Sequence, residues 1–203
     1  MFSLDQMAFS AQEVLCRPVL PTMTVDWVLM AAMAAPHFLY AFVWLWPSVW
    51  LSIFGKENAL STFTLCGFLG KVMQAQVVLL WFWSSRSSGL CLLQPIGILQ
   101  WLAALMLIAS GQALNLACFK ALGTDGVYYG TKLGKTIPWV TCWPFNHGLS
   151  HPQYMGSALT VWGIAILLHS QMTVGSPAQN GVVMAACGWT ALYALSAATE
   201  QYL

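Results

Sequence analysis

The sequence predicts an all-α integral membrane protein in which about five hydrophobic helices form a single membrane-embedded domain over residues 1–203. Hydrophobic residues make up 59% of the chain and charged residues only 6%, whereas about a quarter of the residues in a soluble domain are charged. Residues 27–54, 87–119 and 136–199 contain no Asp, Glu, Lys or Arg. Because one bilayer crossing needs about 20 apolar residues, several crossings fit into this length.

Breaks in the apolar runs set the limits of the expected helices. A first long helix, at about residues 25–54, contains Pro36 and Pro47 and is therefore expected to be kinked or re-entrant. The polar residues 55–58 end it. The remaining crossings are expected at about residues 61–83, 90–119, 154–170 and 182–199, with turns at 84–89 and 175–180. The last two of these helices could instead form a shallow hairpin.

The N-terminal residues and the overall charge exclude several other classes of protein. Residues 4–15 have the apolar spacing of a short helix that lies in the membrane interface, and residues 1–20 lack the basic segment of a cleaved signal peptide. The net charge is only +1, without a basic cluster that would bind a nucleic acid. The six cysteines form no CxxC pair, so no metal site is indicated. We therefore expect lipid-like or small partners.

The segment at residues 120–151 is expected to be a long functional loop, because it is rich in glycine and proline and shows no clear helical pattern. Its apolar and aromatic content argues against disorder. With five crossings, the C-terminus and four lysines share the side of this loop, and two arginines lie on the other side: Lys56, Lys120, Lys132 and Lys135 against Arg17 and Arg86. The positive-inside bias then places the loop in the cytosol.

Polar residues near two helix ends are expected to converge with this loop and to outline a pocket. Glu200 is the only acidic residue after Asp125, and an ionisable group at the edge of a membrane helix is a functional candidate. It could also be a charge that simply stays in water. Ala109, Ser110 and Gly111 form a notch of small residues that could accept an adenosyl group. The alternative for Gly111 is close helix packing.

Several short motifs follow one another in the second half of the chain. They are the glycine run Ala121-Leu122-Gly123, Gly126, Gly130 and Gly134, the box Trp143-Pro144-Phe145-Asn146, and the box Pro152, Tyr154, Gly156 and Ser157. In this order they resemble the phosphatidylethanolamine N-methyltransferase / phospholipid methyltransferase family, which shows an ALGxxGxxxGxxxG run, an FPFN box and an NPxYxGS box. The resemblance is close over about residues 110–163 and extends loosely to Gln201.

The resemblance implies an endoplasmic-reticulum enzyme that uses S-adenosylmethionine to methylate phosphatidylethanolamine, or its mono- and dimethyl derivatives, toward phosphatidylcholine. It places the cofactor at a GxG element, which falls on Ala109-Ser110-Gly111, and at a Glu-Glu pair, which falls on Glu200 and Gln201. The first glycine is thus an alanine here, and the second carboxylate is an amide, which removes one charge from the cofactor site. The resemblance also assigns four box residues to this site: Asn146, Pro152, Tyr154 and Gly156.

Methylation of an amine also needs a base and a site for a cation. If Glu200 binds the ammonium group of the cofactor, His151 is the favoured base among four candidates near this face. These candidates are His147, His151, Asp125 and Glu200. Aromatic faces stabilise cations, although aromatic residues at a membrane interface also serve as anchors. The candidate substrate-binding aromatics are Tyr128, Tyr129, Trp143 and Phe145. His37 and His169 lie within apolar runs and are expected to be structural.

Two alternatives remain open from the sequence alone. The run His151-Pro152-Gln153-Tyr154-Met155-Gly156 also resembles the RHPxYxG box of isoprenylcysteine carboxyl methyltransferases, with Ser150 in place of the arginine. The chain could also be a non-catalytic membrane scaffold that keeps the fold and has lost the Glu-Glu pair. The glycine run and the WPFN box favour the phospholipid enzyme over both.

Overall fold

The structure, a computed structural model, describes residues 25–85 and 95–202. Within them the chain forms five α-helices and one short 3-10 helix and no strand, which confirms the predicted all-α class. The elements are α2 (Val25–Leu45), α3 (Pro47–Ser85), α4 (Ile98–Val127), η1 (Phe145–His147), α5 (Pro152–Ser170) and α6 (Pro177–Tyr202). The predicted interfacial helix at residues 4–15, both arginines and residues 86–94 lie outside the described residues.

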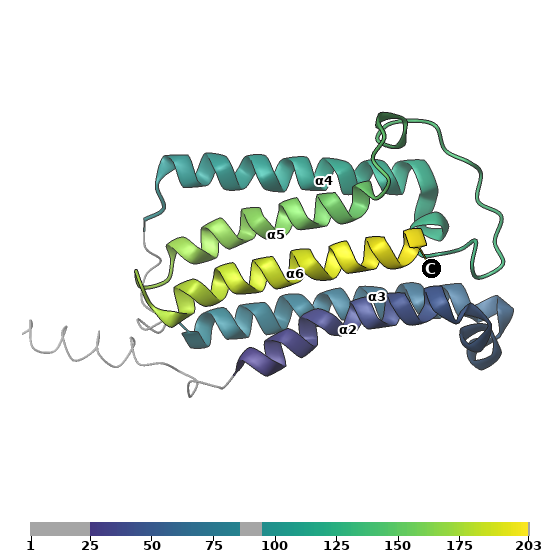
Figure 1. Cartoon of the computed structure of the whole chain (residues 1–203), viewed down its shortest axis with the longest axis horizontal. Helices are drawn as coiled ribbons and strands as arrows, with labels where there is room; N and C mark the ends of the chain where they lie inside the picture. Colours follow the sequence, from purple (N-terminus) through teal and green to yellow (C-terminus); the bar gives the residue numbers. More distant parts are fainter. Residues whose placement is uncertain (1–24, 86–94, 203) are drawn as a thin grey trace, which may run out of the picture.

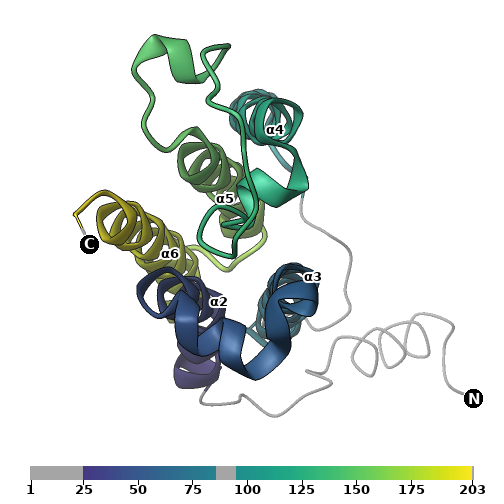
Figure 2. The same cartoon turned by 90° about the vertical axis from the view of Figure 1, so that its right-hand side faces the viewer.

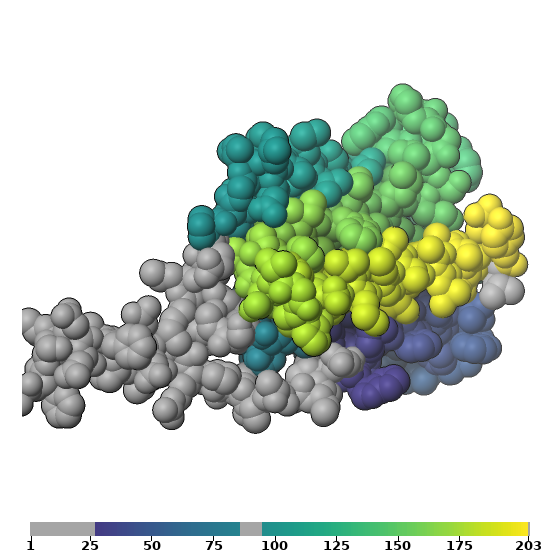
Figure 3. Space-filling view, turned by 60° about the vertical axis from the view of Figure 1, so that its left-hand side comes forward, coloured from purple at the N-terminus to yellow at the C-terminus, as the bar shows by residue number. Residues whose placement is uncertain are grey.

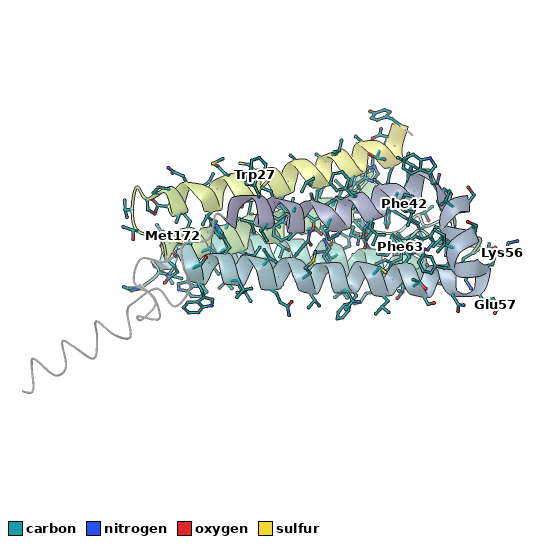
Figure 4. The ribbon with its side chains drawn as sticks, turned by 90° about the horizontal axis from the view of Figure 1, so that it is seen from below. Trp27, Phe42, Lys56, Glu57, Phe63 and Met172 are labelled. Atoms are coloured by element: carbon teal, nitrogen blue, oxygen red, sulfur yellow. The ribbon has the colours of Figure 1, made fainter. Side chains whose placement is uncertain are left out.

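The five helices run alternately in opposite directions along one axis (Figure 1). α4 packs on α5, α5 on α6, α6 on α2, and α2 on α3. Viewed along the axis, the helices form an open arc with α3 and α4 at its two ends (Figure 2). One end of the bundle carries the bend in α3, where Lys56 and Glu57 lie, and Met172 marks the opposite end (Figure 4).

Four of the helices, α2, α3, α4 and α6, are long and apolar enough to cross a membrane. Large apolar side chains cover their outer faces, and Trp27 and Leu99 are 83% and 77% exposed. A bilayer suits such a surface, because water would leave these side chains in contact with a polar solvent. α5, the predicted fourth crossing, has 19 residues but is not among the four spans. It lies in the arc between α4 and α6.

The predicted first helix at residues 25–54 is interrupted in the structure next to Pro47, one of the two prolines from which a kinked or re-entrant helix was predicted. Trp46 is not helical, and α3 begins directly after it at Pro47. A proline fits the first turn of a helix, because its missing N–H would have no partner there. Pro36, by contrast, lies inside α2.

The predicted helix end at residues 55–58 is a bend rather than an end. Gly55 has φ 72° and ψ 156°, and the helix resumes after it and continues to the end of α3. The indole Nε1 of Trp50 donates a hydrogen bond of 2.9 Å to the carbonyl of Ala59, which ties the two sides of the bend together.

The predicted loop at residues 120–151 is shorter than expected, because α4 continues past residue 120, where the loop was predicted to begin. The helix bends at Gly123 (φ 67°, ψ 176°) but ends only at Val127, so the connection to α5 begins at Tyr128. The limits of the other helices also differ from the predicted ones. Residues 84 and 85 belong to α3, α4 starts at Ile98 rather than at about residue 90, and α6 starts at Pro177, within the predicted turn at 175–180.

α4 and α5 approach each other through glycines. A Cβ atom added to Gly111 would lie 2.4 Å from the carbonyl oxygen of Gly156, and a Cβ on Gly156 would lie 2.6 Å from the carbonyl oxygen of Gly111. About two turns further along, a Cβ on Gly163 would lie 2.8 Å from the carbonyl oxygen of Ala104. The two backbones therefore touch, as small residues allow in membrane helices. This contact fixes the start of α5 against α4.

Candidate active site

The start of α5, the end of α6 and the connection at residues 128–151 lie at the same end of the bundle (Figure 1). The space-filling view shows this connection and the last turn of α6 projecting side by side at that end (Figure 3). The predicted convergence of the long loop with Glu200 is therefore present in the fold.

Glu200 is the centre of a hydrogen-bonded cluster. Its Oε1 accepts hydrogen bonds from the hydroxyl groups of Tyr129 and Tyr154, whose oxygen atoms lie 3.1 Å apart. Its Oε2 lies 3.5 Å from Nδ1 of His151. The side chain of Glu200 is only 14% exposed. A charge that merely stays in water would lack such partners, so the structure disfavours that alternative for Glu200.

Three separate segments supply this cluster. Tyr129 directly follows α4 in a left-handed conformation with φ 57°, and its ring stacks on Phe63 of α3 with centroids 5.4 Å apart. His151 precedes the first residue of α5, and its ring stacks on that of Tyr154 one turn later, with centroids 5.8 Å apart. Glu200 lies in the last turn of α6. The cluster thus joins elements that are distant in sequence.

The tyrosine hydroxyl groups of the cluster act as fixed donors. Burial raises the pKa of the Tyr129 phenol far above its usual range, and the nearby Tyr154 and Glu200 raise this pKa further. Tyr129 therefore stays protonated at physiological pH and can only donate to a carboxylate. The result is a carboxylate that is held in one orientation.

The cluster has room for one more cationic donor. A carboxylate offers about four lone-pair sites; the two tyrosines use Oε1, whereas Oε2 has only the more distant His151. Gln201 is exposed and lies on a different face of α6 from Glu200, since adjacent residues of a helix point about 100° apart. The unused lone pairs of the Glu200 carboxylate thus suit the ammonium group of an amino-acid moiety, such as that of S-adenosylmethionine, which would donate to a single carboxylate.

The other candidate bases do not join the cluster in the part of the chain that the structure describes. Asp125 is exposed in the last turns of α4, where its carbonyl accepts a hydrogen bond of 2.7 Å from the Gly130 N–H. His147 is exposed in η1, and its Nδ1 lies 2.6 Å from Oδ1 of Asn146. Of the candidates, only His151 faces Glu200.

The remaining predicted site residues are not members of the cluster in the part of the chain that the structure describes. The Tyr128 ring packs near Phe63 and Phe119, with centroids 6.0 Å and 6.3 Å away. Trp143 is exposed and Phe145 is half-buried. Pro152, the first residue of α5, is buried. The roles of these residues toward a cofactor or a substrate stay predictions.

The predicted adenosyl notch is divided between two surfaces. Ala109 and Ser110 are exposed on α4, whereas Gly111 and Gly156 are buried in the contact between α4 and α5. The packing alternative for Gly111 is therefore the one that the structure shows. A role of Ala109 and Ser110 in cofactor binding stays a prediction.

A cavity of about 550 Å³ lies inside the arc of helices. All five helices line it, and it reaches Tyr128 and Tyr193 near the Glu200 end. Lys71 of α3 also lines it. Sequence reasoning gave Lys71 no role. It also did not find Tyr193, whose hydroxyl group accepts a hydrogen bond of 3.0 Å from Nζ of Lys71.

His37 lies in the same layer of the bundle. Its Nδ1 is 3.0 Å from the hydroxyl oxygen of Ser196 on α6, and its ring contacts that of Tyr193 edge-on, with centroids 4.8 Å apart. These contacts between α2 and α6 agree with the structural role that was expected for it.

The comparisons with known proteins concern mainly this half of the chain. The sequence model of a family described as phospholipid methyltransferase matches residues 99–201, about half of the chain. A curated protein of Arabidopsis thaliana, named phosphatidyl-N-methylethanolamine N-methyltransferase, is 35% identical over 120 residues. That alignment covers 58% of this chain and 66% of the Arabidopsis protein. No solved structure matches the chain significantly. The whole Glu200 cluster lies within residues 99–201, and Lys71 does not.

Proposed function

Because the chain belongs to the phospholipid methyltransferase family, we propose that it uses S-adenosylmethionine to methylate the amine of phosphatidylethanolamine, or of its mono- and dimethyl derivatives, toward phosphatidylcholine. The observation that carries this proposal is the Glu200 cluster, a largely buried carboxylate at the end of the bundle toward which a mainly apolar cavity extends as far as Tyr128 and Tyr193. The name of the Arabidopsis relative supports a partly methylated ethanolamine phospholipid as one acceptor.

In this proposal Glu200 binds the α-ammonium group of the methyl donor through Oε2. Tyr129 and Tyr154 hold the carboxylate in place by donating to Oε1. When bound, S-adenosylmethionine supplies a methyl group on a positively charged sulfur. Alignment of the reacting atoms accounts for most of the acceleration in such a transfer, so the rigid support of Glu200 matters more than its charge alone.

His151 is the proposed base. The acceptor amine is largely protonated at neutral pH, like a lysine with a pKa of about 10, and it must lose a proton before its lone pair is available. Nδ1 of His151 faces Oε2 of Glu200, so a proton on Nδ1 leaves Nε2 as the acceptor. The side chain is 22% exposed, which lets the proton pass on to water.

We place this end of the bundle in the cytosol, at the membrane of the endoplasmic reticulum, where the methyl donor is available. The bend in α3 and the connection at residues 128–151 lie at this end and carry Lys56, Lys132 and Lys135. Lys120 lies in the last part of α4, at the same end. An excess of lysine on one side of a membrane protein marks its cytosolic side.

One assay tests the proposed activity against both alternatives. Labelled S-adenosylmethionine is supplied with phosphatidylethanolamine, its monomethyl and dimethyl forms, and a prenylated cysteine acceptor. We expect label in at least one of the three phospholipids and none in the prenylcysteine. Label in the prenylcysteine alone would establish the carboxyl methyltransferase activity. No transfer, together with no binding of S-adenosylhomocysteine, would establish a scaffold.

A further inference from the structure

Lys71 is a charged residue in the middle of the apolar helix α3. Gly55, at the bend, and Ser85, at the end of the helix, are each more than about 20 Å away along the axis at 1.5 Å per residue. If α3 spans the bilayer, this ammonium group lies at the depth of the lipid chains. A charge at such a depth is costly and usually marks a functional site.

The ammonium group of Lys71 has a neutral partner. Nζ donates its hydrogen bond to the Tyr193 hydroxyl and lies 5.1 Å from the centre of the Tyr193 ring. Among residues 25–85 and 95–202, no carboxylate forms an ion pair with it. An ammonium group has three donors, so Lys71 keeps donors for an anionic ligand in the cavity that it lines.

The cavity changes in polarity along its length. Around Lys71 its lining includes Gln153, Ser157 and Tyr193, which offer further hydrogen-bond donors. Toward the opposite end of the bundle the lining becomes apolar, with Trp81 and Val182 in the core cluster that also contains Met172. Lys71 is the only formally charged side chain among the described residues that line this cavity.

We propose that Lys71 binds the phosphodiester of the lipid acceptor while the apolar end of the cavity takes up an acyl chain. The identity of the lipid rests on the proposed function, whereas the anion-binding site at Lys71 rests on the residues that line the cavity. Charge complementarity commits the site to a phosphodiester, because an acyl chain alone would not need a cation at this depth.

The order of groups along the site matches the order of groups in a phospholipid. The Tyr193 ring, beside Lys71, lies 5.8 Å from the Tyr154 ring, and Tyr154 donates to Glu200. A recess of about 40 Å³ also connects Lys71 with Tyr154. From the apolar end, the site thus runs through Lys71 to Tyr154, Glu200 and His151. In a phospholipid of this kind the acyl chain is followed by the phosphate, and the amine lies two carbons beyond the phosphate. A phosphate bound at Lys71 therefore directs the amine toward His151.

Equilibrium binding of phosphatidylethanolamine with a spin-labelled acyl chain tests the inference, in detergent micelles and without a methyl donor. Lys71→Met keeps the length of the side chain and removes the charge. We expect it to weaken binding roughly 10- to 100-fold, as the loss of a charge-assisted hydrogen bond does. Lys71→Arg should retain most of the affinity. Lys56→Met, which removes an exposed charge from the bend of the same helix, should bind like the parent.

A second lipid separates phosphate recognition from a purely structural role of Lys71. Dioleoyl-dimethylaminopropane carries two acyl chains and an amine but no phosphate. Its binding should be the same in the parent and in Lys71→Met, and S-adenosylhomocysteine should bind both proteins equally. Unchanged binding of phosphatidylethanolamine in Lys71→Met, or equal weakening for both lipids, would overturn the inference. Lys71-dependent lipid binding in a parent protein that transfers no methyl group would support the phosphate site and contradict the proposed function.

Discussion

The hydroxyl group of Tyr129 donates a hydrogen bond to the carboxylate of Glu200, although 71 residues separate the two in sequence. Tyr129 lies in the connection between α4 and α5, and Glu200 lies in the last turn of α6. This bond fastens the connection to the end of the bundle. The orientation of the carboxylate therefore depends on a residue that follows α4.

Replacing Glu200 by glutamine should weaken the binding of S-adenosylhomocysteine by roughly 10- to 100-fold. A charge-assisted hydrogen bond contributes about 1.5–3 kcal/mol, and about 1.4 kcal/mol corresponds to a factor of ten. Isothermal titration measures the change. The control is Gln201→Glu at an exposed position, which should preserve or improve the affinity. A Glu200→Gln protein that binds like the parent would remove Glu200 from the cofactor site.

Replacing His151 by glutamine should lower kcat by roughly 100- to 10,000-fold, the usual contribution of a general base, with little change in S-adenosylhomocysteine affinity. Raising the pH should restore part of the rate, because the acceptor amine then loses its proton to solvent. His147→Gln is the matched control, since the His147 side chain is exposed and, among the hydrogen bonds described, contacts only its neighbour Asn146. A larger loss in the control than in His151→Gln would assign the base to His147.

Leucine at Gly111 should reduce folded yield and Tm rather than selectively block the cofactor. Even a Cβ at this position would collide with the backbone of α5, and overpacking a tight contact costs about 1–3 kcal/mol or more. Ser110→Leu, exposed on the same helix, tests the adenosyl notch without this collision. We expect weaker S-adenosylhomocysteine binding at unchanged Tm. Unaltered binding would place the adenosyl group elsewhere.

A protease site inserted near Thr131 should be cut from outside intact microsomes. Thr131 is exposed, and the lysine-rich end of the bundle is proposed to face the cytosol. A second site near Gly175, which is exposed at the opposite end, serves as the control and should be protected until detergent is added. The reverse pattern of cleavage would invert the proposed topology.

The sequence predicted the existence of the helices from their apolar runs, but it predicted their limits less well near proline and glycine. Each of these residues can end a helix, bend it or lie within it. Pro36 is accommodated inside α2, whereas Pro47 starts a new helix after a break at Trp46. Gly123 bends α4 without ending it. Local pattern does not distinguish these cases, because the packing of each helix against its neighbours decides them.

The sequence identified the residues of the candidate site more readily than the contacts between them. Glu200, His151, Tyr154 and Tyr129 were all candidates, but Tyr129 was assigned to the substrate and is found holding the carboxylate. The cavity and the place of Lys71 in it depend on α3 and α4 lying at the two ends of an open arc. Such an arrangement arises from contacts between helices that are distant in sequence, so the residue pattern of a single helix does not predict it.

The stacking of Tyr129 on Phe63 connects the two proposed binding regions structurally. Phe63 belongs to α3, the helix that contributes Lys71 to the cavity wall, and Tyr129 orients Glu200. A lipid that displaces α3 therefore disturbs the carboxylate through one aromatic contact. Linkage between two equilibria is reciprocal: if the lipid alters the affinity for S-adenosylhomocysteine by some factor, S-adenosylhomocysteine alters the affinity for the lipid by the same factor. The contact between Tyr129 and Phe63 would then contribute to the size of this coupling.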